Sequence, residues 1–376
     1  MKTSKAGRLG QLVKVGAKVV GQSVINTLAA KTKLQTRIEQ AKLLTQTLAE
    51  LKGASMKFGQ MLSIQGEHLL PPEVAAILSR LQDAVPAFSS QEMWKIVERE
   101  LGDRAKDLRF EQEALAAASI GQVHRVVLPD ETRAVLKIQY PGIDLAMNSE
   151  VAVLKRVLSL FAKVYMGELE VDPLIAEIRS LLLHEVDYVR EGQCLQFFKN
   201  SLSGDSRFVV PQYYPGYSTN RVLCMSEESG VSFKKYLQYP SPYKEREQIG
   251  RAIFELYLKE FYQLNTVQTD PNFGNYLIRK SDQSQVVLLD FGATKTFSPE
   301  LVAHYKQFVI ALLDRNREQS LVVADKMGFL SQEESEEVKE LFYQTCLMTM
   351  EPFFKDEAFD FVQSDLPIRI RENGMG

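Results

Sequence analysis

The sequence has few of the residues that build disulfides and zinc sites. Its 376 residues include three cysteines and four histidines. Cys194, Cys224 and Cys346 lie far apart without the spacing of metal ligands, which indicates buried or free thiols in a reducing compartment. The histidines are equally scattered, at His68, His124, His184 and His304. This distribution argues against a disulfide scaffold and against a zinc enzyme.

Long apolar runs and a strong net charge are also missing. No apolar stretch approaches the roughly 20 residues that a membrane-spanning helix needs, and no secretory leader with a cleavage site is evident. The net charge is -3, so no global field favours nucleic acid as a partner. The composition, 45% hydrophobic and 25% charged, is that of a globular protein with one two-lobed unit or two domains.

Acidic residues are missing from the start of the chain, where the first is Glu39. Residues 1–33 mix apolar side chains with basic ones, namely Lys2, Lys5, Arg8, Lys14, Lys18, Lys31 and Lys33. Such a basic amphipathic segment, delimited here as 1–35, is typical of a helix on an anionic membrane surface or of one packed on its own domain with solvated lysines. A mitochondrial presequence is the third interpretation, weakened by the single arginine and few serines.

A helical extension is predicted for residues 36–107. Over residues 33–51 the apolar side chains recur mostly every three or four positions, as on one face of a helix. Small residues follow that let a helix approach a neighbour closely, namely Gly53, Ala54, Ser55 and Gly59. Lys57 and Gln60 are three positions apart, so both polar groups can enter one cleft. The alternative is a helix crossing with a solvated lysine.

Short strands and a phosphate-type loop are predicted next. Strands over 108–115, 121–128 and 132–139 are joined by turns, and Pro129–Glu131 is a hairpin signal between the last two. The first loop, 116–123, follows the kinase pattern G-x-G-x-x-G-x-V in part. Its candidate nucleotide contacts are Ala116, Ala117, Ala118, Ser119, Gly121 and Val123. Alanine replaces the first two glycines of the pattern and permits fewer backbone conformations, so a tight cover over phosphate is less accessible.

A lysine on the third strand is the candidate phosphate-binding side chain. Lys137 ends the run Ala134–Lys137, in which alternate side chains point to one face of a sheet. In a kinase cleft it would hold the α- and β-phosphates, whereas a single strand lysine is more often exposed to solvent. The helical stretch 173–198 contains acidic candidates for its counter-ion, namely Glu185, Asp187 and Glu191.

Two further motifs have the spacing of a kinase catalytic loop and metal loop. Asp270 is followed five residues later by Asn275, and an apolar run then ends in Asp290-Phe291-Gly292. In that chemistry Asp270 faces the acceptor group, while Asn275 and Asp290 hold Mg²⁺ on the triphosphate of ATP. A strand ending at Met225, the last candidate nucleotide contact, leads into a polar connector able to hold the adenine edge. Each motif is weak alone, but their order is that of a protein kinase and predicts a kinase-like ATP site.

These motifs together resemble the UbiB/AarF atypical kinase family over roughly residues 45–330. The resemblance is carried by Lys57-Phe58-Gly59-Gln60, the Ala-rich loop, Glu185-Val186-Asp187-Tyr188 and the catalytic loop. It implies an α+β, two-lobed protein-kinase-like fold whose N-terminal helical extension lies across the active-site cleft. It also implies that Lys57 reaches Glu185 and Asp187 as a regulatory contact, with Gln60 in the same motif. Lys137 would pair with Glu191, and Mg-ATP would bind between the lobes.

The resemblance also implies ATP hydrolysis beside membranes, in support of ubiquinone or related prenyl-lipid synthesis, rather than protein phosphorylation. The residues agree, because only the short segment Ala293–Phe297 separates Asp-Phe-Gly from the next helical stretch and no Ala-Pro-Glu element follows. The catalytic loop departs from the family pattern His-Ala-Asp-Pro-His-Pro-Gly-Asn. Here it is Gln268-Thr269-Asp270-Pro271-Asn272-Phe273-Gly274-Asn275. This sequence keeps Asp270 and Asn275 but lacks both histidines and the second proline of the family pattern. We therefore expect metal binding to be retained and substrate handling and turnover to differ.

The sequence thus predicts four segments: 1–35, the helical extension 36–107, a kinase-like N-lobe with inserted helices over 108–226, and a C-lobe over 227–376. The leading hypothesis is an ATP- and Mg²⁺-dependent atypical kinase or ATPase whose catalytic candidates are Lys57, Lys137, Glu191 and Asp270. Its expected partners are a nucleotide, a prenyl-lipid or quinone-pathway ligand with the enzymes of that pathway, and a peripheral membrane surface, without nucleic acid.

The expected location is the cytoplasm, at or near the inner membrane, with the mitochondrion as alternative. Two rival functions remain open from the residues alone. One is a small-molecule phosphotransferase of the choline or aminoglycoside kinase type. The other is a non-catalytic, ATP-gated lipid-binding protein.

Overall fold

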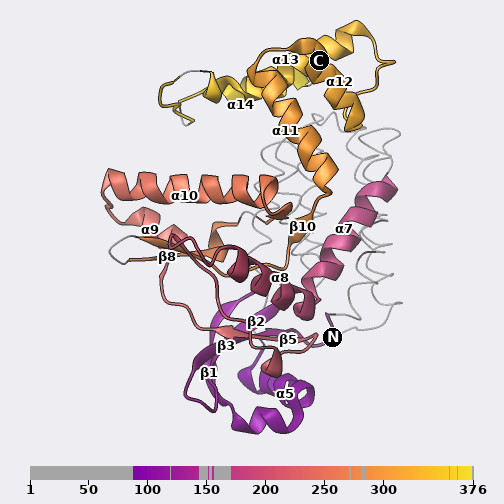
Figure 1. Ribbon diagram of the computed structural model, residues 1–376. Coiled ribbons are helices and arrows are strands. Elements are labelled where there is room, and N and C mark those ends of the chain that lie inside the picture. Colours follow the sequence, from indigo (N-terminus) through magenta and orange to yellow (C-terminus); the bar gives the residue numbers. More distant parts are fainter. Residues whose placement is uncertain are drawn as a thin grey trace, which may run out of the picture. The chain divides into compact units, whose positions relative to one another are not determined.

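The computed structural model describes most of the chain from Phe88 onward (Figure 1). The described residues are 88–118, 120–143, 151, 155, 171–270, 272–280, 284–354, 356–361 and 363–374. The predictions for segment 1–35, for Lys57 and Gln60 of the helical extension, and for Ser119 lie outside them. The described chain forms two compact units. The first runs to Pro242 and also includes the segment after Asp270 up to Ala293, and the second holds Tyr243–Asp270 and the chain from Thr294.

The described part of the first unit begins with helix α5 (Ser90–Leu101), which packs on an antiparallel sheet (Figure 1). The Ser89 side chain accepts from the Glu92 amide and the Glu92 carboxylate accepts from the Ser89 amide, which together form a capping box. A 3₁₀ turn (Gly102–Asp107) leads into the sheet. The sheet order is β1 (Arg109–Ala117), β2 (Gly121–Val127), β3 (Arg133–Gln139) and β5 (Val222–Ser226). The shared core contains Met93, Val97, Leu101, Leu136, Ile138 and Val222.

The predicted phosphate-type loop is shorter than the sequence indicated. Ala116 and Ala117 continue β1 and pair with Val123 and Gln122 of β2, after a register shift at Ala114. The Ala118 amide donates to the Gly121 carbonyl at 2.8 Å and closes the turn. Glycine weakens a strand, whereas alanine is compatible with the extended conformation. Strand β1 therefore continues through Ala117, where a Gly-rich sequence would form a loop. Gly121 is required by packing, because a Cβ there would stand 2.2 Å from the Ile138 carbonyl oxygen.

The helical stretch predicted over 173–198 is two helices instead of one. Helix α7 (Val171–Glu185) ends just before Val186, and α8 (Tyr188–Ser201) begins after Asp187. The Asp187 carboxylate caps α8 by accepting from the Arg190 amide, and aspartate is among the preferred N-cap residues. The side-chain amide of Gln139 on β3 donates to the Val186 carbonyl at 2.6 Å. Both residues between the two helices, Val186 and Asp187, are therefore held by hydrogen bonds.

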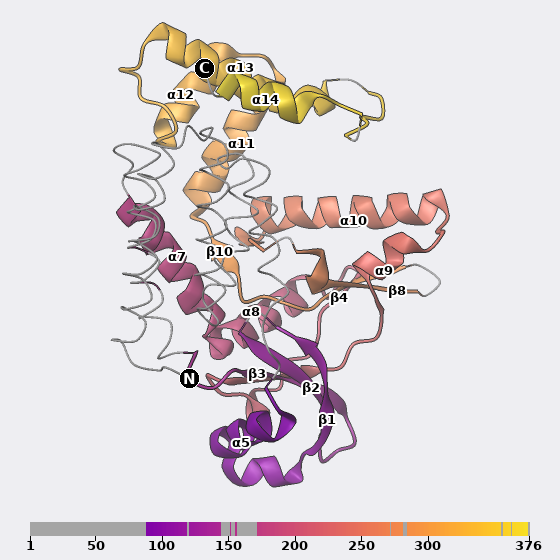
Figure 2. The same cartoon turned by 180° about the vertical axis from the view of Figure 1, so that it is seen from behind.

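A second sheet completes the first unit (Figure 2). Its order is β4 (Phe208–Val209), β9 (Gln285–Leu288), β8 (Tyr276–Arg279) and β6 (Val231–Ser232). A 3₁₀ turn (Pro215–Tyr217) precedes β5, and helix α9 (Phe233–Gln238) follows β6. The hairpin of β8 and β9 pairs Tyr276 with Leu288, which brings the residues before β8 next to those after β9. The two predicted metal ligands belong to these flanking segments.

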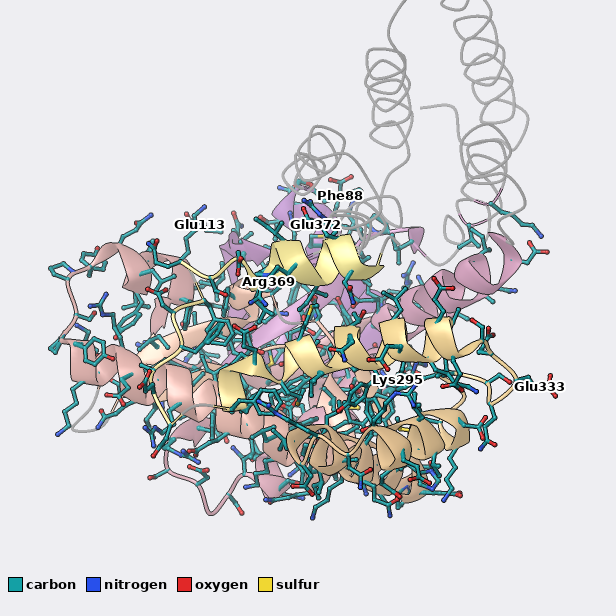
Figure 3. The ribbon with its side chains drawn as sticks, turned by 90° about the horizontal axis from the view of Figure 1, so that it is seen from above. Phe88, Glu113, Lys295, Glu333, Arg369 and Glu372 are labelled. Atoms are coloured by element: carbon teal, nitrogen blue, oxygen red, sulfur yellow. The ribbon has the colours of Figure 1, made fainter. Side chains whose placement is uncertain are left out.

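The second unit is mostly helical. Helix α10 (Tyr243–Tyr262) leads to β7 (Thr266–Gln268), which pairs antiparallel with β10 (Thr294–Thr296). The remaining helices are α11 (Pro299–Leu313), α12 (Arg317–Lys326), α13 (Glu336–Thr349) and α14 (Leu366–Gly374), with a 3₁₀ turn at Glu351–Phe353. Their core holds Phe308, Leu312, Val323 and Tyr343. Arg369 on α14, labelled in Figure 3, pairs with Glu351 at 2.6 Å.

Candidate nucleotide and metal site

A buried lysine joins three separate elements of the first unit. The Lys137 ammonium on β3 donates to both carboxylate oxygens of Glu191 on α8, at 2.7 and 3.0 Å. It also donates to Asp290 Oδ2, just beyond β9, at 2.9 Å. Lys137 is 6% exposed and Glu191 is 1% exposed. A strand, a helix and a loop far apart in sequence thus converge on one cation.

The cluster keeps its lysine charged. Burial alone would lower the pKa of Lys137, but the Asp290 and Glu191 carboxylates outweigh it and raise that pKa well above its ordinary value. Burial raises the pKa of Glu191, and the adjacent ammonium opposes that rise. One cation faces two carboxylates, so removal of the lysine would leave buried negative charge without compensation.

Tyr188 covers this cluster, a role that the sequence motif containing it did not reveal. Its ring centroid lies 5.2 Å from the Lys137 ammonium, within the range of a cation–π contact. The residue is fully buried, and no hydrogen-bond partner of its hydroxyl is found in the described part of the chain. A Cβ on Gly121 would stand 3.1 Å from that hydroxyl oxygen. Tyr188 therefore fills the space between the lysine and the end of the Ala-rich turn.

The Asp290-Phe291-Gly292 loop is held by both its backbone and its side chains. Asp290 Oδ1 accepts from the Gly292 amide at 2.9 Å, so both carboxylate oxygens of Asp290 are oriented. Phe291 is fully buried, with its ring centroid 4.8 Å from that of Phe198 on α8. The Arg190 guanidinium donates to the Gly292 carbonyl at 2.9 Å. Sequence reasoning missed Arg190, because its target is a main-chain carbonyl.

Asn275 lies beside the metal loop through the main chain. It ends a 3₁₀ turn, Phe273–Asn275, that the Asn272 side chain caps. The Leu289 amide donates to the Asn275 carbonyl at 3.0 Å, which places Asn275 against the residue before Asp290. Carboxylate and amide oxygens are the donors that Mg²⁺ prefers, and nucleotide sites use one or two carboxylates plus phosphates. Asn275 and Asp290 offer one amide and one carboxylate, a donor set that fits Mg²⁺ bound together with a nucleotide.

The predicted nucleotide contacts are spread over three strands of the first sheet, β1, β2 and β5. Val123 lies directly opposite Lys137 in the ladder of β2 and β3, whereas Ala116 and Ala117 are exposed on β1. Met225 on β5 pairs with Val135 and is 5% exposed. The connector after it is tied internally, because the Ser226 hydroxyl donates to the Glu228 carboxylate at 2.7 Å.

The motif residues Glu185 and Asp187 lie on the two sides of the helix break. Glu185 is the last residue of α7, is 8% exposed, and adds to the negative field that raises the pKa of Lys137. Asp187 caps α8. Lys57, which the resemblance pairs with both, lies outside the described residues, so that contact stays a prediction.

Asp270 belongs to the second unit, and its part in the cluster stays a prediction. It follows β7, whose last residue Gln268 donates its amide to the Glu260 carboxylate on α10 at 3.1 Å. Glu260 is 3% exposed. Burial raises the pKa of Glu260 to about 7, and the Gln268 amide opposes the rise. A buried carboxylate thus holds the strand that leads into the catalytic loop.

Glu260→Gln is expected to stabilise the protein in a pH-dependent way. The pKa of Glu260 is about 7 in the folded protein against an ordinary 4.5. The folded state therefore binds the proton more tightly, and this stabilisation is complete below pH 4.5 and lost as the pH rises through 7. The neutral glutamine avoids that loss, and its advantage in free energy of unfolding should grow to roughly 2–3 kcal/mol at pH 8. Urea unfolding of both proteins from pH 5 to 8 measures it, and an advantage that does not vary with pH would contradict the assignment.

Among the helices that the structure describes, none combines the length and the apolar character of a membrane span.

Comparison with known proteins gives a family match. A model described as the ABC1 atypical kinase-like domain matches residues 80–324, which include Lys137, Glu191, Asp270, Asn275 and Asp290. Among solved structures, Rv3197 from Mycobacterium tuberculosis in complex with erythromycin aligns with a TM-score of 0.58 and 24% identity. That alignment covers 84% of this chain and 79% of the other, and it supports the fold.

Curated relatives extend the match. "Atypical kinase COQ8, mitochondrial" of Saccharomyces cerevisiae is 33% identical over 335 residues, covering 88% of this chain and 66% of the relative. "Atypical kinase COQ8B, mitochondrial" of Rattus norvegicus is 33% identical over 333 residues, covering 88% of this chain and 62% of the relative. The chain therefore spans less than two thirds of the length of these relatives. The resemblance and the kinase-like α+β fold predicted from the sequence are confirmed, and the chain belongs to the ABC1 atypical kinase-like family.

Proposed function

We propose that the protein binds Mg-ATP at the Lys137–Glu191–Asp290 cluster and acts as an atypical kinase or ATPase. The observation that carries this proposal is the buried ammonium of Lys137, held at hydrogen-bond distance from a helix carboxylate and from the Asp of Asp-Phe-Gly. A structural role alone rarely justifies a buried Lys–Glu pair beside a second, half-buried carboxylate, because desolvation cancels most of the attraction between the charges. A site that must hold polyphosphate and metal does justify them.

Each residue has a separate task in this proposal. Glu191 orients Lys137, and Lys137 holds the α- and β-phosphates. Asn275 and Asp290 supply the metal oxygens, and Asp270 orients the nucleophile, either water or a small acceptor. Mg²⁺, when bound, neutralises charge on the triphosphate. Lys137 donates to Asp290 Oδ2 in this structure, and a bound Mg-nucleotide would compete for that hydrogen bond, with Lys137 then available to phosphate and Asp290 to the metal.

The proposed substrate context is prenyl-lipid or quinone metabolism at a membrane surface. The curated relatives named above are called atypical kinases and mitochondrial, which favours the mitochondrion as the location. A peptide substrate is disfavoured by the short path after Asp-Phe-Gly. There β10 (Thr294–Thr296) is followed directly by α11, which begins at Pro299, so no long segment is available to dock a protein chain.

Phosphate release from Mg-ATP tests the proposed function. Wild-type protein should release phosphate, more rapidly with anionic liposomes, and Asp290→Asn should fall to background. The same reactions are analysed for transfer of the γ-phosphate to choline or an aminoglycoside. Transfer without release would assign the protein to the small-molecule phosphotransferases instead. Bound nucleotide without turnover under every condition would favour a non-catalytic, ATP-gated lipid-binding protein.

A further inference from the structure

A series of three hydrogen bonds links the first turn of α8 to the metal loop Asp290–Gly292. One lies within the turn, one crosses from the helix to the loop, and one lies within the loop. Asp187 Oδ1 accepts from the Arg190 amide at 2.9 Å. The Arg190 guanidinium donates to the Gly292 carbonyl at 2.9 Å. The Gly292 amide in turn donates to Asp290 Oδ1 at 2.9 Å. The series runs without interruption from the helix cap to the carboxylate expected to hold the metal.

This turn reaches both oxygens of that carboxylate. Glu191, next to Arg190 on the helix, orients Lys137, which donates to Asp290 Oδ2. Arg190 orients Gly292, which donates to Asp290 Oδ1. The loop lies close against the turn, since a Cβ on Gly292 would stand 3.5 Å from Glu191 Oε2. Two consecutive helix residues therefore act on opposite oxygens of one carboxylate.

We propose that Asp187 and Arg190 are positioning residues for the Asp290 carboxylate, with Gly292 as the link between helix and loop. Asp187 fixes the start of α8 and so the direction of the Arg190 and Glu191 side chains. Arg190 fixes the loop backbone with a charged donor, the stronger class of hydrogen bond. The Gly292 amide keeps the Oδ1 side of the carboxylate fixed while Oδ2 exchanges the Lys137 ammonium for a cation. The inference rests on the proposed function in one respect, namely that Asp290 is a metal ligand.

The proposal gives Asp187 a different task from the one implied by family resemblance. An ion pair with Lys57 needs the negative charge of Asp187, whereas an N-cap needs only a side-chain oxygen at this position. Asparagine and serine cap as well as aspartate, and alanine does not. Substitutions at Asp187 therefore separate the two tasks.

The first test compares Arg190→Met with Lys199→Met. Lys199 lies on the same helix and also donates to a main-chain carbonyl, that of Val210, at 2.9 Å, and Val210 is not part of the Asp290–Gly292 loop. Thermal unfolding with a fixed concentration of ATP is followed as Mg²⁺ is added, and amide hydrogen exchange is measured for residues 289–297 without nucleotide. Arg190→Met should need about tenfold more Mg²⁺ and exchange about tenfold faster in this segment, the factor expected for one lost charge-assisted hydrogen bond. Lys199→Met should change neither quantity. Equal behaviour of the two variants would overturn the proposal.

The second test compares Asp187→Asn, Asp187→Ser and Asp187→Ala in the same two measurements. The asparagine and serine variants should keep wild-type Mg²⁺ dependence and exchange, and the alanine variant should resemble Arg190→Met. Loss of Mg²⁺ response in Asp187→Asn together with unchanged exchange would show that charge matters instead of the cap, and would remove Asp187 from the proposal. If wild-type protein shows no Mg-ATP response but exchange still separates Arg190→Met from Lys199→Met, the proposed function fails while the positioning of the loop stands.

Discussion

Asp290→Asn is expected to abolish the stabilisation that Mg-ATP confers on the protein. The substitution keeps the shape of the side chain and removes the charge that both the cation and Lys137 require. At a nucleotide concentration 100 times the dissociation constant, binding adds about 2.7 kcal/mol to the free energy of unfolding. In a protein of this size that is a shift of several degrees in Tm. Wild-type protein should show the shift with Mg-ATP, and Asp290→Asn should show none.

Asp325→Asn is the matched control for that experiment. Asp325 on α12 is a half-buried carboxylate that accepts from Gln332 at 3.0 Å, far along the chain from the metal loop. It should keep the full Mg-ATP shift. A normal shift in Asp290→Asn would remove Asp290 from the metal site, and loss of the shift in both variants would point to general destabilisation.

Lys137→Met is expected to cost roughly 3–5 kcal/mol of stability at pH 8, the usual penalty for breaking a buried ion pair by removing one partner. The loss arises because Glu191, 1% exposed, is left as a buried carboxylate without its cation. Without the ammonium the pKa of Glu191 rises further, since burial already raises it. The penalty should therefore shrink as the pH falls and the carboxyl takes up a proton. Urea unfolding at pH 6 and pH 8 measures both effects.

The double variant Lys137→Met, Glu191→Leu separates stability from function. It removes both charges of the pair and leaves apolar side chains of similar volume, which typically restores or exceeds wild-type stability. It should fold well and bind no nucleotide. A double variant that is no more stable than Lys137→Met would show that the two side chains are not energetically coupled. Nucleotide binding by the double variant would show that the cluster is not the ATP site.

Motif spacing in the sequence predicted Lys137 and Asp290 as parts of one ATP site. Lys137 on a strand, a helix carboxylate and the Asp of Asp-Phe-Gly follow one another in the order of kinase motifs, and their side chains converge as expected. The family resemblance chose Glu191 from three acidic candidates. The order of several motifs along one chain is a more specific signal than any one motif alone.

Contacts between a side chain and a main-chain carbonyl cannot be predicted from the sequence in this way. Arg190 donates to a carbonyl 102 residues away, and any residue at position 292 offers that carbonyl. The helix break before Tyr188 was missed because the apolar periodicity continues through it. The residue type of Asp187 was the available clue to the helix break, because aspartate is a preferred N-cap residue and Asp187 caps α8. The burial of Glu260 is likewise a property of the tertiary structure, so the sequence alone does not reveal it.

The most direct measurement is calorimetric titration of the protein with ATP, with Mg²⁺ present and with Mg²⁺ chelated. If the Lys137–Glu191–Asp290 cluster is the nucleotide site, wild-type protein binds ATP tightly only with Mg²⁺. The stable double variant Lys137→Met, Glu191→Leu then gives no binding heat. Equal affinity of the wild type and the double variant would contradict the assignment of this cluster.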